Sequence, residues 1–141
     1  MTVRLHPVPL DFVNQTWPAI AGYLAPALAL CESGEALYNL DHVRQYVVSG
    51  EWELFVALTE DNQIIGAGTV SYGNYPLHRV AFITTVGGKG IINKDTYFDL
   101  LTYLKLQRGV TLVQAFGRKS INRLLQRYDF KPRNTLVELT L

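Results

Sequence analysis

The sequence predicts a single α/β domain built on a mixed sheet, antiparallel in its first half and parallel in its second, with helices on its faces. Apolar residues recur at helical spacing in the first thirty positions, and strand-like runs occupy the middle of the chain. Helical and strand-like segments then alternate around a glycine-rich turn. No repeat, low-complexity tract or linker divides the chain, so we expect residues 1–141 to form one domain.

The first thirty residues are predicted to be helical with interruptions. Pro18 and Pro26 limit the regularity, because proline lacks an amide donor and clashes with the preceding turn. Pro18 fits best in the first turn of a helix capped near Thr16. Asp41 is expected to cap a second, short helix that ends at Ser49 and Gly50. The apolar residues of the first segment are Phe12, Val13, Trp17, Ile20, Leu24 and Leu28.

Three strand-like runs come next. The runs over 52–58 and 64–72 flank a polar turn and predict a hairpin, and the run over 79–86 is apolar enough to be central in the sheet. Gly66 and Gly68, inside the second run, indicate a bulge or a close approach of another backbone.

The segment after residue 86 predicts a parallel βαβ unit. A glycine-rich turn leads into an amphipathic helix, with Asp95 as its expected cap and Gly109 at its end. A strand over 110–116 follows, and the crossover has the length that two parallel neighbours need. A second amphipathic helix over 121–128 and a last strand over 135–141 complete the predicted domain.

Composition excludes several classes of protein. Thirteen Lys and Arg against twelve Asp and Glu give a net charge of +1, without the basic excess of a nucleic-acid binder. Cys31 is alone and has no histidine at recognisable spacing, and the three histidines lack metal-ligand spacing, so no metal is expected. No apolar run can cross a bilayer, and the first residues lack the pattern of a signal peptide. We therefore expect a soluble, cytoplasmic protein without a membrane partner.

Four stretches resemble the GNAT superfamily of acyl-CoA-dependent N-acyltransferases. Residues 51–57 with 64–68 are similar to the family's second and third strands, and 82–91 to its fourth strand and pyrophosphate loop. Residues 108–110 are similar to its helix-to-fifth-strand junction, and 121–130 to its last helix. Segments 85–89 and 117–120 look most like small GNAT-like proteins of tailed bacteriophages, which implies the host cytoplasm or the virion as the place of action.

The resemblance implies an acetyl-CoA site along the third strand-like run and the turn after it. The strand backbone would hold the pantetheine arm, and the turn, with Lys89 and the helix dipole, would hold the pyrophosphate. Glycine-rich turns also occur for purely steric reasons, so both interpretations stay open. The implied cofactor-binding residues are Ile83, Thr84, Thr85, Val86, Gly87, Gly88, Lys89 and Gly90.

Two departures from the family's pattern bear on activity. The family's loop reads Arg/Gln-x-x-Gly-x-Gly/Ala, and here Gly87 takes the first position and Ile92 the last, so only Gly90 matches. Leu125 stands where many members carry a tyrosine general acid, with Tyr128 one helical turn later. The loop is thus altered and the proton donor is missing from its usual place.

Acyl transfer to an amine also needs a base or a water chain, and a donor for the leaving thiolate. Glu51 and Glu53 lie on the same side of a strand, so they could equally form its solvated face, and His78 could be an ordinary loop residue. No catalytic residue is assigned, and Glu53, His78 and Tyr128 are kept as candidates. The wider set of bases and donors is Glu51, Glu53, His78, Glu138, Tyr72, Tyr75 and Tyr128.

Two hypotheses for function stay open. In the first, the protein transfers an acetyl group directly from acetyl-CoA to a small-molecule or protein amine. In the second, it is a catalytically silent GNAT-like bacteriophage protein that binds a virion or host protein. The glycine-rich turn favours the first, and the altered loop and missing tyrosine favour the second. The basic run over 118–133 could contact the CoA 3′-phosphate or a nucleic acid, or form a solvated helix face.

Overall fold

The computed structural model describes residues 2–29, 38–116, 119–133, 137 and 139–141. At its centre lies a five-stranded sheet whose strands stand in chain order. The first four strands are antiparallel neighbours, and the last pair is parallel, as predicted. The strands are β1 (Val3–Pro7), β2 (Trp52–Thr59), β3 (Ile64–Asn74), β4 (Arg79–Gly87) and β5 (Leu112–Ala115).

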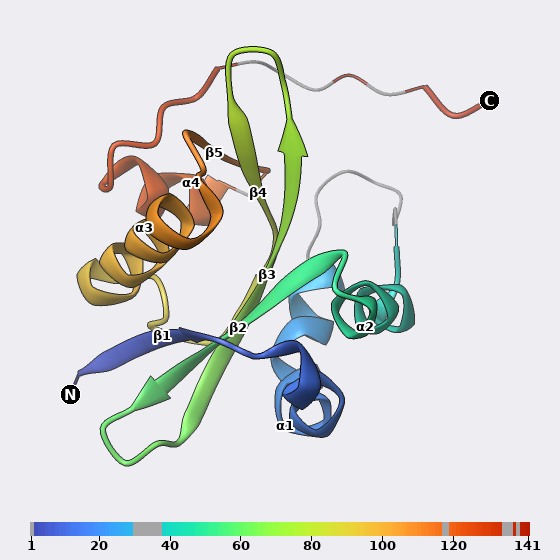
Figure 1. Cartoon of the computed structure of the whole chain (residues 1–141), viewed down its shortest axis with the longest axis vertical. Coiled ribbons are helices and arrows are strands. Elements are labelled where there is room, and N and C mark those ends of the chain that lie inside the picture. Colours follow the sequence, from blue (N-terminus) through green and yellow to red (C-terminus); the bar gives the residue numbers. More distant parts are fainter. Residues whose placement is uncertain (1, 30–37, 117–118, 134–136, 138) are drawn as a thin grey trace.

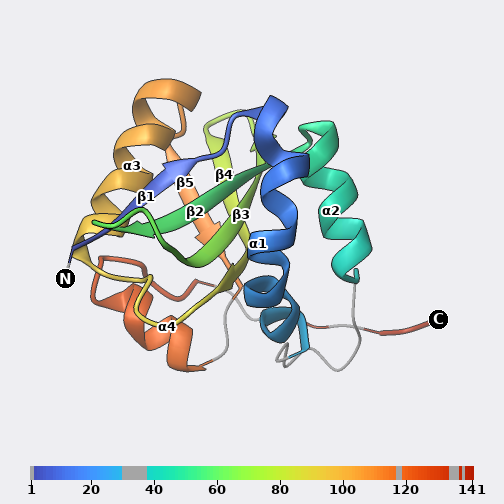
Figure 2. The same ribbon diagram turned by 90° about the horizontal axis from the view of Figure 1, so that it is seen from below.

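Helices cover both faces of the sheet (Figures 1 and 2). α1 (Leu10–Ala29) and α2 (Leu40–Ser49) lie on one face, and α3 (Lys94–Arg108) and α4 (Lys119–Gln126) lie on the other. Successive residues of β2 point to opposite faces, so Leu54 belongs to the core under α1 and α2 and Phe55 to the core under α3.

β1 corrects the prediction that the chain begins with helical structure. Its five residues pair with β2 from Val3 opposite Thr59 to Pro7 opposite Phe55. Asp99 of α3 adds a second attachment, because its carboxylate accepts hydrogen bonds from the Arg4 side chain and the Leu5 N–H. Local periodicity gives no sign of an edge strand whose partners lie about fifty residues away.

α1 corrects the placement of Pro18. The helix starts at Leu10 and runs through both Pro18 and Pro26, so it is not a helix capped near Thr16. One side of α1 is buried against the sheet, including Trp17, Ile20 and Leu24. Burial of that apolar stripe outweighs the loss of two amide donors, since most helix stability in proteins comes from packing.

The C-terminal ends of α2 and α3 agree with the prediction, whereas their N-terminal caps differ from it. Gly50 and Gly109 end α2 and α3 in the left-handed conformation, as predicted. Asn39 and Asn93 are the N-caps, rather than Asp41 and Asp95. Asparagine in an extended conformation accepts the same amide bonds that aspartate would, and both predicted caps lie two residues too late.

The predicted last strand is not found in the part of it that the structure describes. Residues 137 and 139–141 pair with no strand there, and Val137, Leu139 and Leu141 are exposed. The remainder of that segment, with the candidate Glu138, lies outside the described residues, as does Cys31. β5 is also shorter than the predicted 110–116. Within the described ranges, no helix combines the length and hydropathy needed to cross a membrane.

Candidate functional site

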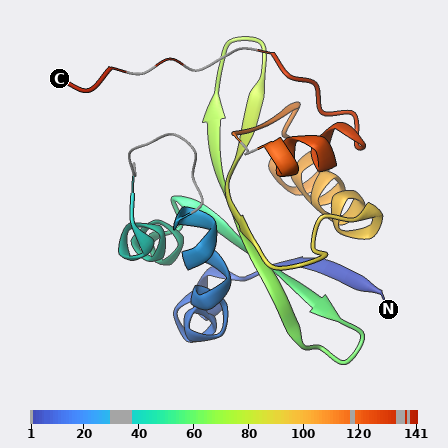
Figure 3. The same ribbon diagram turned by 180° about the vertical axis from the view of Figure 1, so that it is seen from behind.

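β4 and β5 separate half-way along β4. They pair over only four residues, Val80–Ile83 with Leu112–Ala115. β4 then continues to Gly87 beside β3, and its other edge has no strand partner within the described ranges. Figure 3 shows β4 running on from there into the loop that leads to α3. The backbone from Thr84 to Gly87 therefore offers an open strand edge to a ligand.

A bulge in β4 coincides with the point of separation. Val70 pairs with Ile83 and Thr69 with Thr85, so Thr84 is an extra residue in β4.

The irregularity predicted from Gly66 and Gly68 is a separate one, within β3. Ala57 pairs with Gly66 and Leu58 with Ile64, so Ile65 is an extra residue beside Gly66. A Cβ on Gly66 would also lie 2.6 Å from the Gly87 carbonyl oxygen, which is the predicted close approach of another backbone.

Four hydroxyl groups meet at the bulge. Thr69 Oγ1 lies 2.6 Å from Thr84 Oγ1 and 2.5 Å from Thr85 Oγ1. Thr84 Oγ1 also donates to the Thr69 carbonyl oxygen at 3.0 Å. From the α2 side, the Tyr38 hydroxyl donates to the Thr84 carbonyl oxygen at 3.1 Å. Sequence reasoning missed Tyr38 and Thr69, because the hydrogen bonds join positions that are distant in the chain.

The loop between β4 and α3 has backbone donors that the protein does not use. Among the described residues, no hydrogen bond engages the N–H of Gly88, Lys89 or Gly90, and all three residues are exposed. The first turn of α3 differs, because Asn93 Oδ1 accepts the N–H groups of Asp95 and Thr96. An anion at this end of the sheet would therefore bind the loop amides rather than the capped helix.

Packing explains the glycines at the end of β4 and at the start of the loop. A Cβ on Gly87 would lie 1.8 Å from the Tyr23 carbonyl oxygen of α1. Gly88 has φ 118°, and a Cβ there would lie 2.5 Å from the Ile65 carbonyl oxygen. The close contact of α1 with β4 therefore excludes any side chain at Gly87. Gly90 differs, since a Cβ there would meet no atom within 4 Å.

Glu53 does not lie on a solvated face, which corrects that interpretation. It lies under α3 with 13% of its side chain exposed, whereas Glu51 is exposed just before β2. Its carboxylate accepts the Tyr72 hydroxyl at 2.6 Å, the Tyr103 hydroxyl, and Arg108 Nε at 3.1 Å and Nη2 at 3.0 Å. With four donors engaged, Glu53 ties the C-terminal end of α3 to the sheet.

This network alters the acidity of the two tyrosines. Burial, followed by the hydrogen bond to Glu53, raises the pKa of Tyr72 and raises the pKa of Tyr103 to about 12. Both phenols therefore stay protonated at neutral pH and act as donors to the carboxylate. The hydrogen bonds that Arg108 itself donates to Glu53 raise the pKa of Arg108.

His78 and Tyr128 make contacts with different elements of the fold. His78 is exposed in the turn before β4, with Nδ1 3.0 Å from Thr111 Oγ1. Tyr128 follows α4, where its ring stacks on Tyr97 at 4.7 Å and its carbonyl accepts the Tyr97 hydroxyl. Among the described residues, no hydrogen bond, ion pair or ring contact joins Glu53, His78 and Tyr128 to one another or to the bulge.

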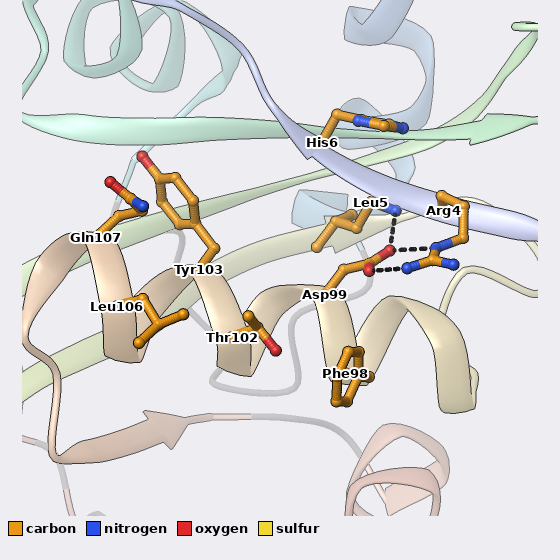
Figure 4. Close-up of a pocket in the computed structure, with 9 residues that line it drawn as sticks. All are labelled: Arg4, Leu5, His6, Phe98, Asp99, Thr102, Tyr103, Leu106 and Gln107. Carbon is orange, nitrogen blue, oxygen red and sulfur yellow. Dashed lines mark hydrogen bonds and ion pairs between the residues drawn. The ribbon is translucent and has the colours of Figure 1, made fainter.

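Two pockets flank α3, away from the bulge. A groove of about 520 Å³ runs between β1 and α3, where Arg4 and the Leu5 N–H converge on Asp99 and His6 points away (Figure 4). A second pocket, of about 400 Å³, lies between the start of α3 and the end of α4, with Lys94 and Arg127 in its lining. The part of the chain that is described contains no cluster of side chains able to hold a metal ion.

Comparison with known proteins settles the fold. The chain matches no family model and no curated protein. Solved structures that it resembles include an aminoglycoside acetyltransferase from an uncultured soil metagenomic sample, in complex with trehalose. That structure has a TM-score of 0.67 and 15% identity, over 99% of this chain and 96% of the other. This fold is the GNAT acetyltransferase fold.

Other GNAT-fold structures agree over the whole chain. A predicted acetyltransferase from Clostridium acetobutylicum, solved with acetyl-CoA, has a TM-score of 0.62 and 13% identity, covering 99% and 96% of the two chains. A ribosomal-protein-alanine N-acetyltransferase from Brucella melitensis biovar Abortus 2308 has a TM-score of 0.63 and 13% identity, covering 99% of each chain. The predicted fold class is confirmed, whereas the resemblance to bacteriophage proteins stays a prediction.

Proposed function

We propose that the protein is an acetyl-CoA-dependent N-acetyltransferase. The observation that carries this proposal is the continuity, within this fold, of an open strand edge and a loop with unused amide donors. The edge from Thr84 to Gly87 offers backbone N–H and C=O groups to the amides of the pantetheine arm. The loop from Gly88 to Gly90 offers N–H donors and the Lys89 ammonium to the pyrophosphate.

The stretch fits this ligand by its chemistry. The predicted cofactor residues, 83–90, form one uninterrupted path that starts at the bulge and ends at the exposed loop. The loop supplies unused N–H donors, as a diphosphate requires, and a Cβ on Gly90 would meet no atom within 4 Å. The near-neutral net charge means that phosphate recognition depends on these few local groups.

The reaction would be a direct transfer. The acceptor nitrogen forms a bond to the acetyl carbonyl carbon, the carbon–sulfur bond breaks, and the proton lost by the amine ends on the CoA sulfur. Acetyl-CoA supplies the activated thioester. A backbone N–H at the bulge is suited to donate to the carbonyl oxygen as negative charge develops there. Roles for Tyr128 and His78 stay predictions, and the four bonds of Glu53 leave it poorly placed to accept a proton.

The acceptor is proposed to be an amine of a small molecule or of a protein. Two structures of similar fold support this breadth, one an aminoglycoside acetyltransferase in complex with sisomicin and the other a ribosomal-protein-alanine N-acetyltransferase. A likeness of fold does not choose between these classes.

A calorimetric and thermal titration with CoA tests the proposal, with a matched pair of variants at Gly90. This residue has φ 71°, which asparagine and aspartate tolerate best among side chains. Gly90→Asn should bind CoA nearly as the wild type does. Gly90→Asp has the same shape but adds a negative charge beside the pyrophosphate, so its Kd should rise at least about tenfold.

The wild type should be stabilised by about 2.7 kcal/mol when CoA is present at 100 times its Kd. Absence of any heat or stabilisation at millimolar CoA would overturn the proposal. That result would instead favour a catalytically silent protein, which should co-purify with a virion or host protein. Equal weakening by Gly90→Asn and Gly90→Asp would also contradict the pyrophosphate assignment.

A further inference from the structure

We propose that Thr69 and Tyr38 are positioning residues that hold the β4 bulge in the shape that binds an acyl carbonyl group. The inference rests on the proposed function and assigns it two side chains outside the predicted cofactor stretch. Its starting point is a coincidence of three features at Thr84. The bulge, the end of β5 pairing and the group of hydroxyls all occur at this residue.

Thr69 holds the bulge from β3. Its side chain is fully buried in the middle of the sheet, where a hydroxyl lowers stability unless it is hydrogen-bonded. A valine would fill the same volume and suits a strand equally well. Among the described residues, the hydroxyl has two hydrogen-bond partners, Thr84 and Thr85, which flank and form the bulge. Its presence is therefore coupled to the bulged shape of β4.

Tyr38 holds the same peptide from the opposite direction. Its hydroxyl donates to the Thr84 carbonyl oxygen, and its ring meets Trp52 edge-on, with centroids 5.2 Å apart. Trp52 is itself stacked on Tyr46 of α2 at 4.6 Å. The position of the Tyr38 hydroxyl is thus set by β2 and α2, two elements that form no strand pairing with β4.

The two contacts fix the direction of the peptide between Thr84 and Thr85. A donor to an acyl carbonyl must be aimed in advance, because reorientation during the reaction would cancel its benefit. The loop amides of Gly88 to Gly90 lie beyond the end of β4 and do not depend on these hydroxyls. Loss of either hydroxyl should therefore weaken recognition of the acetyl group and leave recognition of the CoA nucleotide unchanged.

The test compares CoA with acetyl-CoA labelled with ¹³C at the carbonyl carbon, so that no acceptor is required. For the wild type, acetyl-CoA should bind at least about fivefold more tightly than CoA, and the bound carbonyl resonance should move downfield. Thr69→Val should keep the CoA Kd within twofold but lose the preference for acetyl-CoA and most of the downfield shift. Thr69→Ser, which retains the hydroxyl, should restore both.

Tyr38→Phe provides a second variant that does not disturb the buried centre of the sheet. Tyr46→Phe is its matched control, because Tyr46 packs on the same tryptophan and, in the described part of the chain, its hydroxyl makes no hydrogen bond. Tyr38→Phe should lose the carbonyl shift and Tyr46→Phe should keep it. If either Thr69→Val or Tyr38→Phe folds and retains both the shift and the preference, the inference is overturned. A wild type that binds CoA without preferring acetyl-CoA also overturns it, and a wild type that binds neither ligand overturns the proposed function as well.

Discussion

Replacing Gly87 with alanine should destabilise the protein strongly, because α1 leaves no space for a side chain at this point. A Cβ on Gly87 would lie 1.8 Å from the carbonyl oxygen of Tyr23 and 2.6 Å from its carbonyl carbon. Ordinary contact begins near 3.4 Å, so the backbones of β4 and α1 would have to separate by about 1.6 Å, the difference between the two distances. Neither contact atom belongs to a side chain that could rotate away.

The magnitude follows from what this separation would loosen. Ile20 and Leu24, on either side of Tyr23 in α1, are 0% exposed and pack on the sheet. Overfilling a core costs about 1–3 kcal/mol, and removing contacts of large buried side chains costs about 2–5 kcal/mol. We expect a loss of about 3 kcal/mol in the free energy of unfolding, which lowers Tm by roughly 10 °C in a domain of this size.

Urea unfolding followed by tryptophan fluorescence measures the effect, and Gly73→Ala is the matched control. A Cβ on Gly73 of β3 would meet no atom within 4 Å. Since alanine is favoured over glycine inside a strand by about 0.5–1 kcal/mol, this control should be as stable as the wild type or slightly more so. If the two variants differ by less than about 1 kcal/mol, the steric explanation of Gly87 is refuted.

Two further predictions concern pH. The pKa of Tyr103, raised to about 12 from 10.0 by burial and by Glu53, means that the folded state retains this proton more tightly. The stability that this proton contributes is present below pH 10 and is lost between pH 10 and about 12. The urea midpoint of Tyr103→Phe should therefore fall less steeply with pH over this range than that of the wild type. Equal slopes for the two proteins would count against the assignment. The hydrogen bond from Arg4 lowers the pKa of Asp99 below its ordinary 3.8, so the stability that Asp99 contributes is present at neutral pH and lost as the pH falls through the lowered value. Asp99→Asn should lower the free energy of unfolding by about 1 kcal/mol at pH 7, a small value because solvent screens the exposed Arg4. The difference in stability from the wild type should shrink below pH 3.8. A difference that persists in acid would contradict the assignment.

Much of the β-α-β part of the chain could be predicted from local pattern. The strand-like runs at 52–58 and 64–72, and the apolar run at 79–86, correspond to β2, β3 and β4 within a few residues. Gly50 and Gly109 end their helices as predicted. A helix often ends at a residue in the left-handed conformation, and a single glycine is enough to favour that conformation. The order of elements then sufficed for the resemblance to the GNAT fold. β1 escaped prediction because its pairing with β2 is entirely non-local.

The candidate site was predictable only as a stretch of backbone. The spacing of Gly87, Gly88 and Gly90 indicated a turn between a strand and a helix. The structure shows that the three positions differ in how much space they leave for a side chain. Gly87 and Gly88 make room for α1 and for β3, and Gly90 alone has free space around it. Sequence could not separate these cases, because the atoms nearest to a Cβ at Gly87 or Gly88 belong to segments more than twenty residues away.

By itself, then, the sequence determined a single mixed α/β domain, the order of its central strands and a glycine-rich turn between β4 and α3. Those features depend on periodicity and on the backbone freedom of glycine, which neighbouring residues alone decide. Tertiary structure decided that Glu53 is bound by two tyrosines and an arginine, and that Thr69 and Tyr38 meet at the β4 bulge. These contacts join residues from 15 to 55 positions apart. They exist only because the packed sheet and helices bring their side chains together.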